Sequence, residues 1–176
     1  WSKALMAGSG DQPFGTVGYG TAISHDGTSW VAVGDPLFEI AVNKGTILYS
    51  TDAVTWTSAL MADSGTQPFG VSGMGNAIYN NGTSWVAVGD NRNSTDAGTI
   101  LYSTNAVTWT SGQMADGSQP FGTTGWGNAI YHDGTSWVAV GNNVVADESN
   151  NILYSTDAAT WFSAQMADSG TQPFGT

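Results

Sequence analysis

The 176-residue chain contains no cysteine, and its only basic residues are Lys3, Lys44 and Arg92. Without cysteine there is no disulfide framework, no thiolate nucleophile and no cysteine-based zinc or iron site. Fourteen acidic residues bring the formal net charge to -11. Isolated cations cannot form the basic surface that nucleic acid requires, so these absences exclude nucleic-acid binding and disfavour anionic membranes.

Long apolar runs are also missing, because no stretch approaches the roughly 20 residues that span a bilayer. Nothing at the N-terminus resembles a signal peptide, and the chain starts and stops within a repeat. We therefore expect no membrane insertion, and either a processed product or a segment of a longer repeat protein. A surface poor in lysine and rich in Asn, Gly, Ser and Thr indicates an extracellular, cell-surface or virion-surface location.

The dominant feature of the sequence is a repeat of about 53 residues, a period typical of propeller blades. One text follows each recurring tryptophan, at Trp1, Trp56, Trp109 and Trp161. The repeat divides the chain into a partial repeat (1–16) and three predicted units (17–70, 71–122 and 123–176).

Each unit contains four short runs of β-forming residues. The first runs are 21–24, 76–79 and 128–131, and the second runs are 30–33, 85–88 and 137–140. The third runs are 47–50, 100–103 and 152–155, and the fourth runs begin at Thr55, Thr108 and Thr160. Asp-Gly or Asn-Gly lies between the first two runs of each unit, which predicts antiparallel hairpins. Helical periodicity is absent, so the sequence predicts an all-β fold.

Units of this kind predict β-propeller blades, each a four-stranded antiparallel sheet joined to the next by a Gly/Pro linker such as 63–70. A β-solenoid is the alternative, but its coils repeat every ~20 to 30 residues and the hairpin signals argue against it. Three blades cannot close a ring, because propellers have roughly four to eight. We expect copies of the chain or further repeats to complete the ring, and residues 1–6 could complete a neighbour's blade by strand addition.

The turn between the third and fourth runs has a recurring text. It reads STDAVTW at 50–56, STNAVTW at 103–109 and STDAATW at 155–161. This text resembles the Asp-box (BNR-like) repeat of sialidase-type β-propellers, Ser-x-Asp-x-Gly-x-Thr-Trp, and is similar to its non-catalytic surface-protein branch. It is one residue shorter between Asp and Thr, lacks the Gly, and has Asn105 in the middle copy.

The resemblance implies a structural role for the motif, in which the Asp carboxylate accepts hydrogen bonds from its own turn and the Trp packs between blades. An Asn side-chain oxygen can accept the same bonds. The residues concerned are Ser50, Asp52, Trp56, Ser103, Asn105, Trp109, Ser155, Asp157 and Trp161.

The same resemblance suggests catalysis of the sialidase type, in which three arginines bind the substrate carboxylate. This chain has only Arg92, so the composition excludes such a site. Glu39 and Glu148, in variable loops, are the acids that do not recur. His25 and His132 are replaced by Asn80 in the other unit. We therefore predict no catalytic residue, no metal site and no cofactor; an inactive relative of a glycoside hydrolase is the third alternative for the function.

Ligand binding is predicted where the copied text varies. The variable loops 35–45, 90–98 and 142–151 differ in length and chemistry, and aromatic residues enter one repeat position near them. The candidates are Tyr19, Met74, Trp126, Asp35, Asp90 and Asn142. Aromatic rings beside Asp and Asn oxygens suit glycans, although they could also fill space near the axis. Multivalent glycan binding is the first hypothesis, and a purely structural subunit of a virion, fibre or surface layer is the alternative.

Overall fold

The computed structural model describes residues 3–37, 46–70, 72–92, 98–143, 151–167 and 173. In these ranges all regular elements are β-strands, so the all-β prediction is confirmed. No helix in the described part of the chain is long and apolar enough to cross a membrane.

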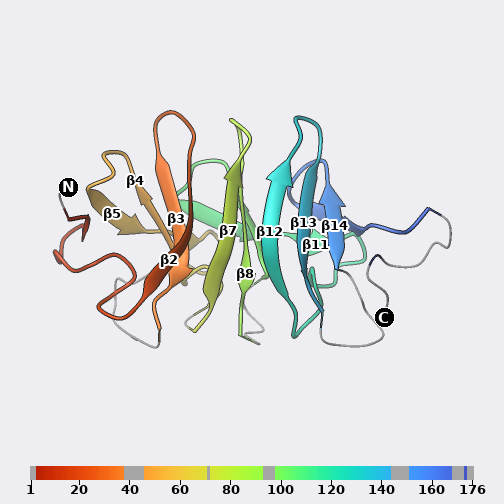
Figure 1. Cartoon of the computed structure of the whole chain (residues 1–176), viewed down its shortest axis with the longest axis horizontal. Coiled ribbons are helices and arrows are strands. Elements are labelled where there is room, and N and C mark those ends of the chain that lie inside the picture. Colours follow the sequence, from red (N-terminus) through yellow and green to blue (C-terminus); the bar gives the residue numbers. More distant parts are fainter. Residues whose placement is uncertain are drawn as a thin grey trace.

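Three five-stranded sheets follow one another along the chain (Figure 1). Sheet 1 consists of β1 (Leu5–Met6), β2 (Tyr19–His25), β3 (Trp30–Asp35), β4 (Ile47–Ser50) and β5 (Thr55–Ser58). Sheet 2 consists of β6 (Leu60–Met61), β7 (Met74–Asn80), β8 (Trp85–Asp90), β9 (Ile100–Ser103) and β10 (Thr108–Ser111). Sheet 3 consists of β11 (Gln113–Met114), β12 (Trp126–His132), β13 (Trp137–Asn142), β14 (Ile152–Ser155) and β15 (Thr160–Ser163).

The fifth strand of each sheet corrects the prediction of four-stranded antiparallel units. The four strands of one unit pair antiparallel, and a two-residue strand from the preceding repeat adds in parallel to the outermost one. Leu5 pairs with Thr55 in this way, and Leu60 pairs with Thr108. The added strand covers backbone groups that an edge strand would leave unpaired. Strand β1 therefore completes a sheet of its own chain, and not one of a neighbour.

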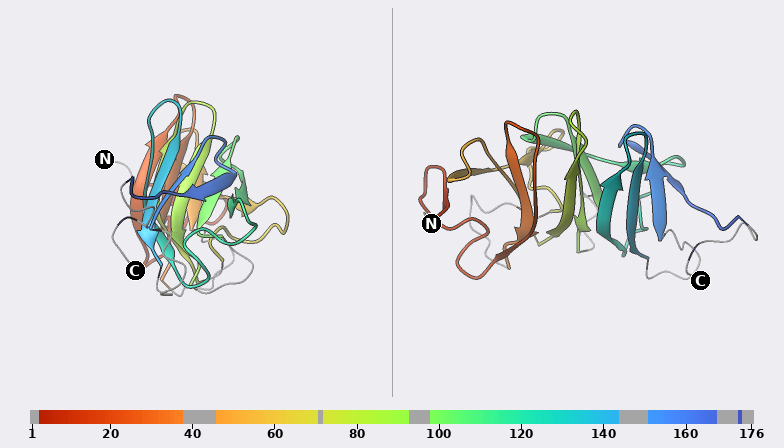
Figure 2. Two further views of the ribbon diagram at one scale, coloured as in Figure 1. Left: turned by 90° about the vertical axis from the view of Figure 1, so that its right-hand side faces the viewer. Right: turned by 45° about the horizontal axis from the view of Figure 1, so that its top comes forward.

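The sheets form an open row. Their first strands, β2, β7 and β12, lie side by side along the molecule, with sheets 1 and 3 at opposite ends (Figure 1). Seen end-on, the three sheets overlap, whereas the tilted view separates them (Figure 2). No ring is closed within the described residues.

Side chains of the second strand in each unit point alternately to the two faces of the sheet, and these side chains form the core between sheets. In β8, Trp85 and Ala87 pack toward sheet 1, while Val86 and Val88 pack toward sheet 3. Successive side chains of a strand point to opposite faces, so the middle sheet is apolar on both. The cluster between sheets 1 and 2 joins Val31, Val33 and Ile47 of sheet 1 to Met61, Phe69, Ile78, Trp85, Leu101 and Trp109.

Glycine at one repeat position allows the sheets to approach closely. A Cβ built on Gly75 would lie 2.6 Å from the Cβ of Val33, and one built on Gly127 would lie 2.6 Å from the Cβ of Val88. No side chain fits at that separation. The first strand of each following sheet can therefore lie directly against the second strand of the sheet before it.

Candidate functional site

The turn from Ser50 to Trp56 is held by its own polar side chains. Asp52 Oδ1 accepts hydrogen bonds from the backbone N–H groups of Val54 (2.8 Å) and Thr55 (2.7 Å) and from the Ser50 hydroxyl (2.9 Å). The N–H groups of Thr55 and Val54 and the Ser50 hydroxyl lower the pKa of Asp52 to about 2. The carboxylate is thus engaged by its own turn.

The other two copies of the turn use the same bonds. Asn105 Oδ1 accepts from the N–H groups of Val107 and Thr108, each at 2.9 Å, which supplies the acceptor without a charge. Asp157 Oδ1 accepts from the N–H groups that follow it, and that of Thr160 is the main cause of its lowered pKa. The serines close each turn, because the Ser103 and Ser155 hydroxyls bond the side-chain oxygen two residues on.

The tryptophan that ends each turn reaches the core. Trp109 and Trp161 are fully buried, and Trp56 is nearly so. Each indole Nε1 donates to a carbonyl of its own turn, for example Trp109 to Ala106 at 3.1 Å. A buried indole needs such a partner, so the turn and the core are fixed together.

The six predicted ligand residues form three cross-strand pairs. Tyr19 pairs with Asp35 across β2 and β3, Met74 pairs with Asp90, and Trp126 pairs with Asn142. The first member of each pair is the first residue of its strand, because these strands begin two residues earlier than predicted. All three pairs lie at the same end of the first hairpins (Figure 1). The variable loops lie largely outside the described residues, at 38–45, 93–97 and 144–150.

A β-bulge lies near each pair, and in sheets 1 and 2 it directs a polar side chain toward the next sheet. The register shifts after Gly20, Gly75 and Gly127, which leaves Thr21, Asn76 and Asn128 as the extra residues. The Thr21 hydroxyl donates to the carbonyl of Gly75 (2.5 Å), and Asn76 Nδ2 donates to the carbonyl of Gly127 (2.7 Å). The bulges therefore link consecutive first strands.

The second junction, where β7 meets β12, contains a cleft of about 340 Å³. Its lining residues are Met74, Asn76, Asp90, Trp126 and Asn128. The cleft brings together Met74, Asp90 and Trp126, which the sequence singled out, and adds the amides of the two bulges. An indole and a thioether thus face a carboxylate and two amides.

The first junction, where β2 meets β7, contains an ion pair. Arg92 Nη2 lies 2.6 Å from Asp35 Oδ2, and it also contacts the sulfur of Met74 at 3.7 Å. The Asp35 side chain is only 2% exposed. Asp90 holds the corresponding position in sheet 2, whereas the residue that corresponds to Arg92 in the third unit is Val144. A valine cannot pair with a carboxylate, so the two junctions differ in charge.

The histidines take part in hairpin turns. The Nδ1 atoms of His25 and His132 accept hydrogen bonds from Gly27 (3.1 Å) and Gly134 (3.0 Å), and Asn80 uses its side-chain oxygen in the same way. Among the described residues no group of three or more His, Cys, Asp and Glu side chains could hold a metal ion. Glu39 and Glu148 lie outside these residues.

The sequence did not predict a role at the junctions for Asn76, Asn128 or Arg92. The substitution of Thr21 by Asn at a copied position was a usable signal for the bulge residues. The pairing of Arg92 has no local sequence signal, because its partner Asp35 lies 57 positions away.

Comparison with known proteins adds no assignment: no protein-family model matches the chain, and no curated protein matches its sequence.

Proposed function

We propose that this chain is a non-catalytic repeat module that binds neutral glycans on an extracellular, cell or virion surface. The observation that carries the proposal is the cleft of the second junction, where Trp126 faces Asp90, Asn76 and Asn128. Sugars offer an apolar C–H face to an aromatic ring and several hydroxyls to amides and carboxylates. A neutral sugar fits best, because the chain carries a net charge of -11 and Asp90 lines the cleft.

We further propose that the three sheets are blades of a β-propeller. Support comes from the chain path: the four strands of a unit run in order outward from the row of first strands, and the chain then adds a short strand to the outer edge of the next sheet before it returns to that row. The turns at Asp52, Asn105 and Asp157 support the resemblance to the Asp-box repeat, since each is closed by the side-chain oxygen at that position.

The experiment is a glycan array followed by titration of the retained sugar, monitored by tryptophan fluorescence. Replacement of Trp126 by Ala removes the stacking surface, and we expect binding to weaken by about tenfold or more, which corresponds to roughly 1.4 kcal/mol. Trp126→Phe keeps a ring and should retain most of the affinity. Specific binding that is indifferent to Trp126→Ala would place the site elsewhere.

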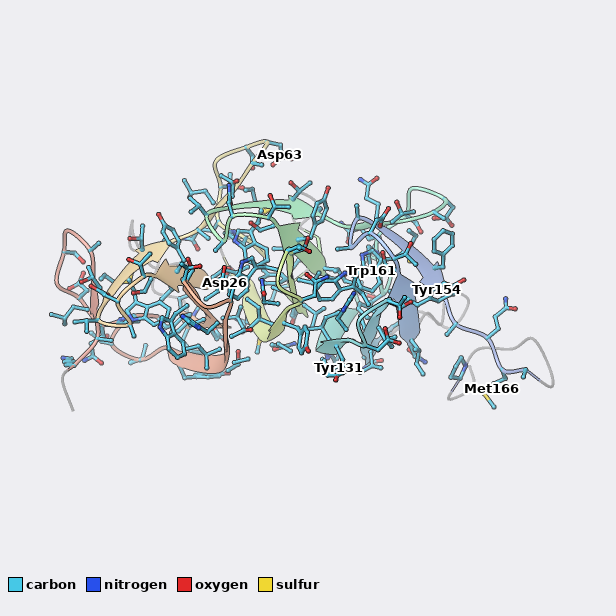
Figure 3. All side chains as sticks on the ribbon, turned by 90° about the horizontal axis from the view of Figure 1, so that it is seen from above. Asp26, Asp63, Tyr131, Tyr154, Trp161 and Met166 are labelled. Atoms are coloured by element: carbon cyan, nitrogen blue, oxygen red, sulfur yellow. The ribbon has the colours of Figure 1, made fainter. Side chains whose placement is uncertain are left out.

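A second variant tests the polar side of the cleft. Asp90→Asn removes an acceptor that can take hydrogen bonds from two hydroxyls, so affinity should fall. The matched control is Asp63→Asn, which removes the same charge from an exposed loop (Figure 3). Equal effects of both variants would attribute the loss to net charge and not to the cleft.

A structural subunit of a virion, fibre or surface layer is the second candidate. It is favoured by exposed apolar side chains on sheet 3, among them Tyr131, Tyr154 and Phe162. An array that retains no sugar, together with large assemblies in solution, would support this candidate over the first.

A further inference from the structure

The face of sheet 3 that points away from sheet 2 carries an exposed apolar patch. Val138 is 40% exposed, whereas Val31 and Val86, at the same position of the other units, are fully buried. Tyr154 and Met166 lie at this end of the molecule (Figure 3). The other large exposed side chains of sheet 3 are Tyr131 and Phe162.

The opposite end of the row exposes the complementary face. Ile23 of sheet 1 is 56% exposed, whereas Ile78 and Ile130 at the same repeat position are 8% exposed. The core cluster of sheet 1 draws on this sheet and its N-terminal segment alone; its members are Met6, Phe14, Ala32, Leu48 and Trp56. It lacks the two valines and the isoleucine that a preceding sheet gives to the other two clusters.

The exposed face of sheet 3 and the exposed face of sheet 1 correspond to the two sides of each interface between sheets within the chain. Sheet 3 offers Val138, Val140 and Ile152, which correspond to Val31, Val33 and Ile47. Sheet 1 offers Gly20 at the position where Gly75 receives Val33; a Cβ there would meet only the Phe14 ring and the carbonyl of Val33. Within the described residues, one chain therefore carries both sides of such an interface, and neither the sheet 3 side nor the sheet 1 side has a neighbouring sheet.

We propose that two copies of the chain associate head to tail, with sheet 3 of each docked on sheet 1 of the other. Such a pair closes a ring of six sheets. Propellers hold roughly four to eight sheets, so two copies fit this range, whereas one copy falls below it and three copies exceed it. The occupant of the sheet 3 face is a second copy because that face repeats an interface already formed twice within the chain.

Polar contacts of the internal interfaces can be repeated between the copies. Asn76 donates to the carbonyl of Gly127, and Asn128 holds the position to donate to Gly20 of the second copy. The ring of Tyr79 lies 6.1 Å from that of Trp137, edge to face. Tyr131, which is 60% exposed, holds the position to contact the second copy's half-buried Trp30 in the same way.

The association uses sheet faces and not strand exchange. A strand at residues 165–166 would follow the pattern of β6 and β11 and pair with β5 of the next sheet. Strand β1 already pairs with β5 in each copy. Docking of sheet 3 on sheet 1 therefore leaves the added strand of sheet 1 in place.

Docking creates a third junction with its own cleft. By analogy with the second junction, its lining comes from Trp126, Asn128 and Asn142 of one copy and Tyr19 and Thr21 of the other. Leu37 holds the position that corresponds to Arg92, so the arginine of the first junction has no counterpart here. Sugar binding there rests on the proposed function, whereas the association itself does not.

The experiment is a mass measurement on the 176-residue chain by light scattering and sedimentation over a wide concentration range. We expect twice the mass of a single chain. Val138→Asp and Ile23→Asp should each weaken the association by roughly a hundredfold or more, because each buries an unpaired charge at the interface. Both residues are exposed in a single copy, so both variants should fold, which circular dichroism would verify.

Val107→Asp is the matched control. Val107 remains 38% exposed although sheet 2 has neighbours on both faces, so this charge should leave the mass unchanged. A mixture of the Val138→Asp and Ile23→Asp chains provides the test of direction. Head-to-tail docking predicts that one intact interface forms between them, so the mixture should associate more strongly than either variant alone.

A single-chain mass at every concentration, polymers longer than two copies, or pairs insensitive to both substitutions would overturn the proposal. Failure of glycan binding is a separate result, because the second-junction cleft lies within one copy and should still bind sugar in the Val138→Asp variant.

Discussion

The first and second junctions have the same arrangement of strands but different side chains. In the first, Arg92 lies between sheets and pairs with the buried Asp35. In the second, Asp90 occupies the position of Asp35 but lines a cleft of about 340 Å³ with Trp126. The first junction therefore has a cation beside its carboxylate, and the described residues of the second junction place an indole beside theirs.

The two junctions show which positions of the repeat vary and which are constrained by the neighbouring sheet. Sheet pairing and the position of the bulge recur in all three units, and the buried valines recur in sheets 1 and 2, where each packs against the following sheet. Side chains at the rim of the junction change without altering these contacts. The comparison extends to the turns of sheets 1 and 2, which differ in charge at Asp52 and Asn105 and in burial at Ala53 and Ala106.

The largest expected effect comes from Arg92→Met. The substitution leaves the Asp35 carboxylate buried without its cation, and we expect a loss of about 3 kcal/mol in the free energy of unfolding. This value is at the low end for a buried pair, because the Arg92 side chain is 26% exposed. Urea denaturation followed by tryptophan fluorescence measures the loss.

The matched variant changes both partners. Asp35→Asn combined with Arg92→Met removes the unpaired charge, so most of the stability should return. Asp90→Asn, the corresponding change in the second junction, should cost far less than Arg92→Met alone. If Arg92→Met unfolds at the same urea concentration as the original chain, the ion pair does not stabilise the first junction.

The second prediction removes the ion pair from the first junction. Asp35→Asn with Arg92→Val gives the first junction a neutral rim next to Tyr19, Thr21 and Met74. We expect one additional sugar site per chain, measured as stoichiometry by calorimetry with the sugar that the array retains. An unchanged stoichiometry would mean that Tyr19 cannot replace Trp126 as the stacking surface.

The strands and hairpins could be predicted from the sequence, whereas the contacts between sheets could not. The repeat predicted the strands and the hairpins because alternation and Asp-Gly or Asn-Gly turns are local signals. It missed the parallel strands at Leu5, Leu60 and Gln113, because a two-residue strand has no periodicity to detect. Tyr19, Met74 and Trp126 could be predicted as candidate ligand residues only because their repeat position varies between the units. The pairing of Arg92 with Asp35 could not be predicted, because it depends on how closely the two sheets approach, and no local sequence pattern indicates that distance.

The third prediction compares the turns through their alanines. Ala53 has φ 61° and Ala106 has φ 65°, a left-handed conformation that costs an alanine about 1 kcal/mol or more. Ala53 is exposed, so Ala53→Gly should raise the free energy of unfolding by about 0.5 kcal/mol after the greater entropy of glycine in the unfolded chain is counted.

Ala106→Gly tests the same turn in a buried setting. Ala106 is 2% exposed in the core between sheets 1 and 2, and loss of its methyl group forfeits about 0.8 kcal/mol of burial. We expect no gain there. A gain of equal size at both positions, measured by urea denaturation, would show that burial of this methyl group contributes nothing.

The smallest effect concerns acid. The pKa of Asp52 is lowered to about 2 from 3.8 by the N–H groups of Thr55 and Val54 and the Ser50 hydroxyl. A lowered pKa stabilises the fold above the unfolded value, so this contribution is present above pH 3.8 and is lost as the pH falls through about 2. Asp52→Asn should flatten the decline of the melting temperature in this window. Asn105 already lacks a titrating group, so Asn105→Asp should steepen the decline. Parallel melting curves for both variants and the original chain between pH 4 and pH 2 would mean that these turns do not set its acid sensitivity.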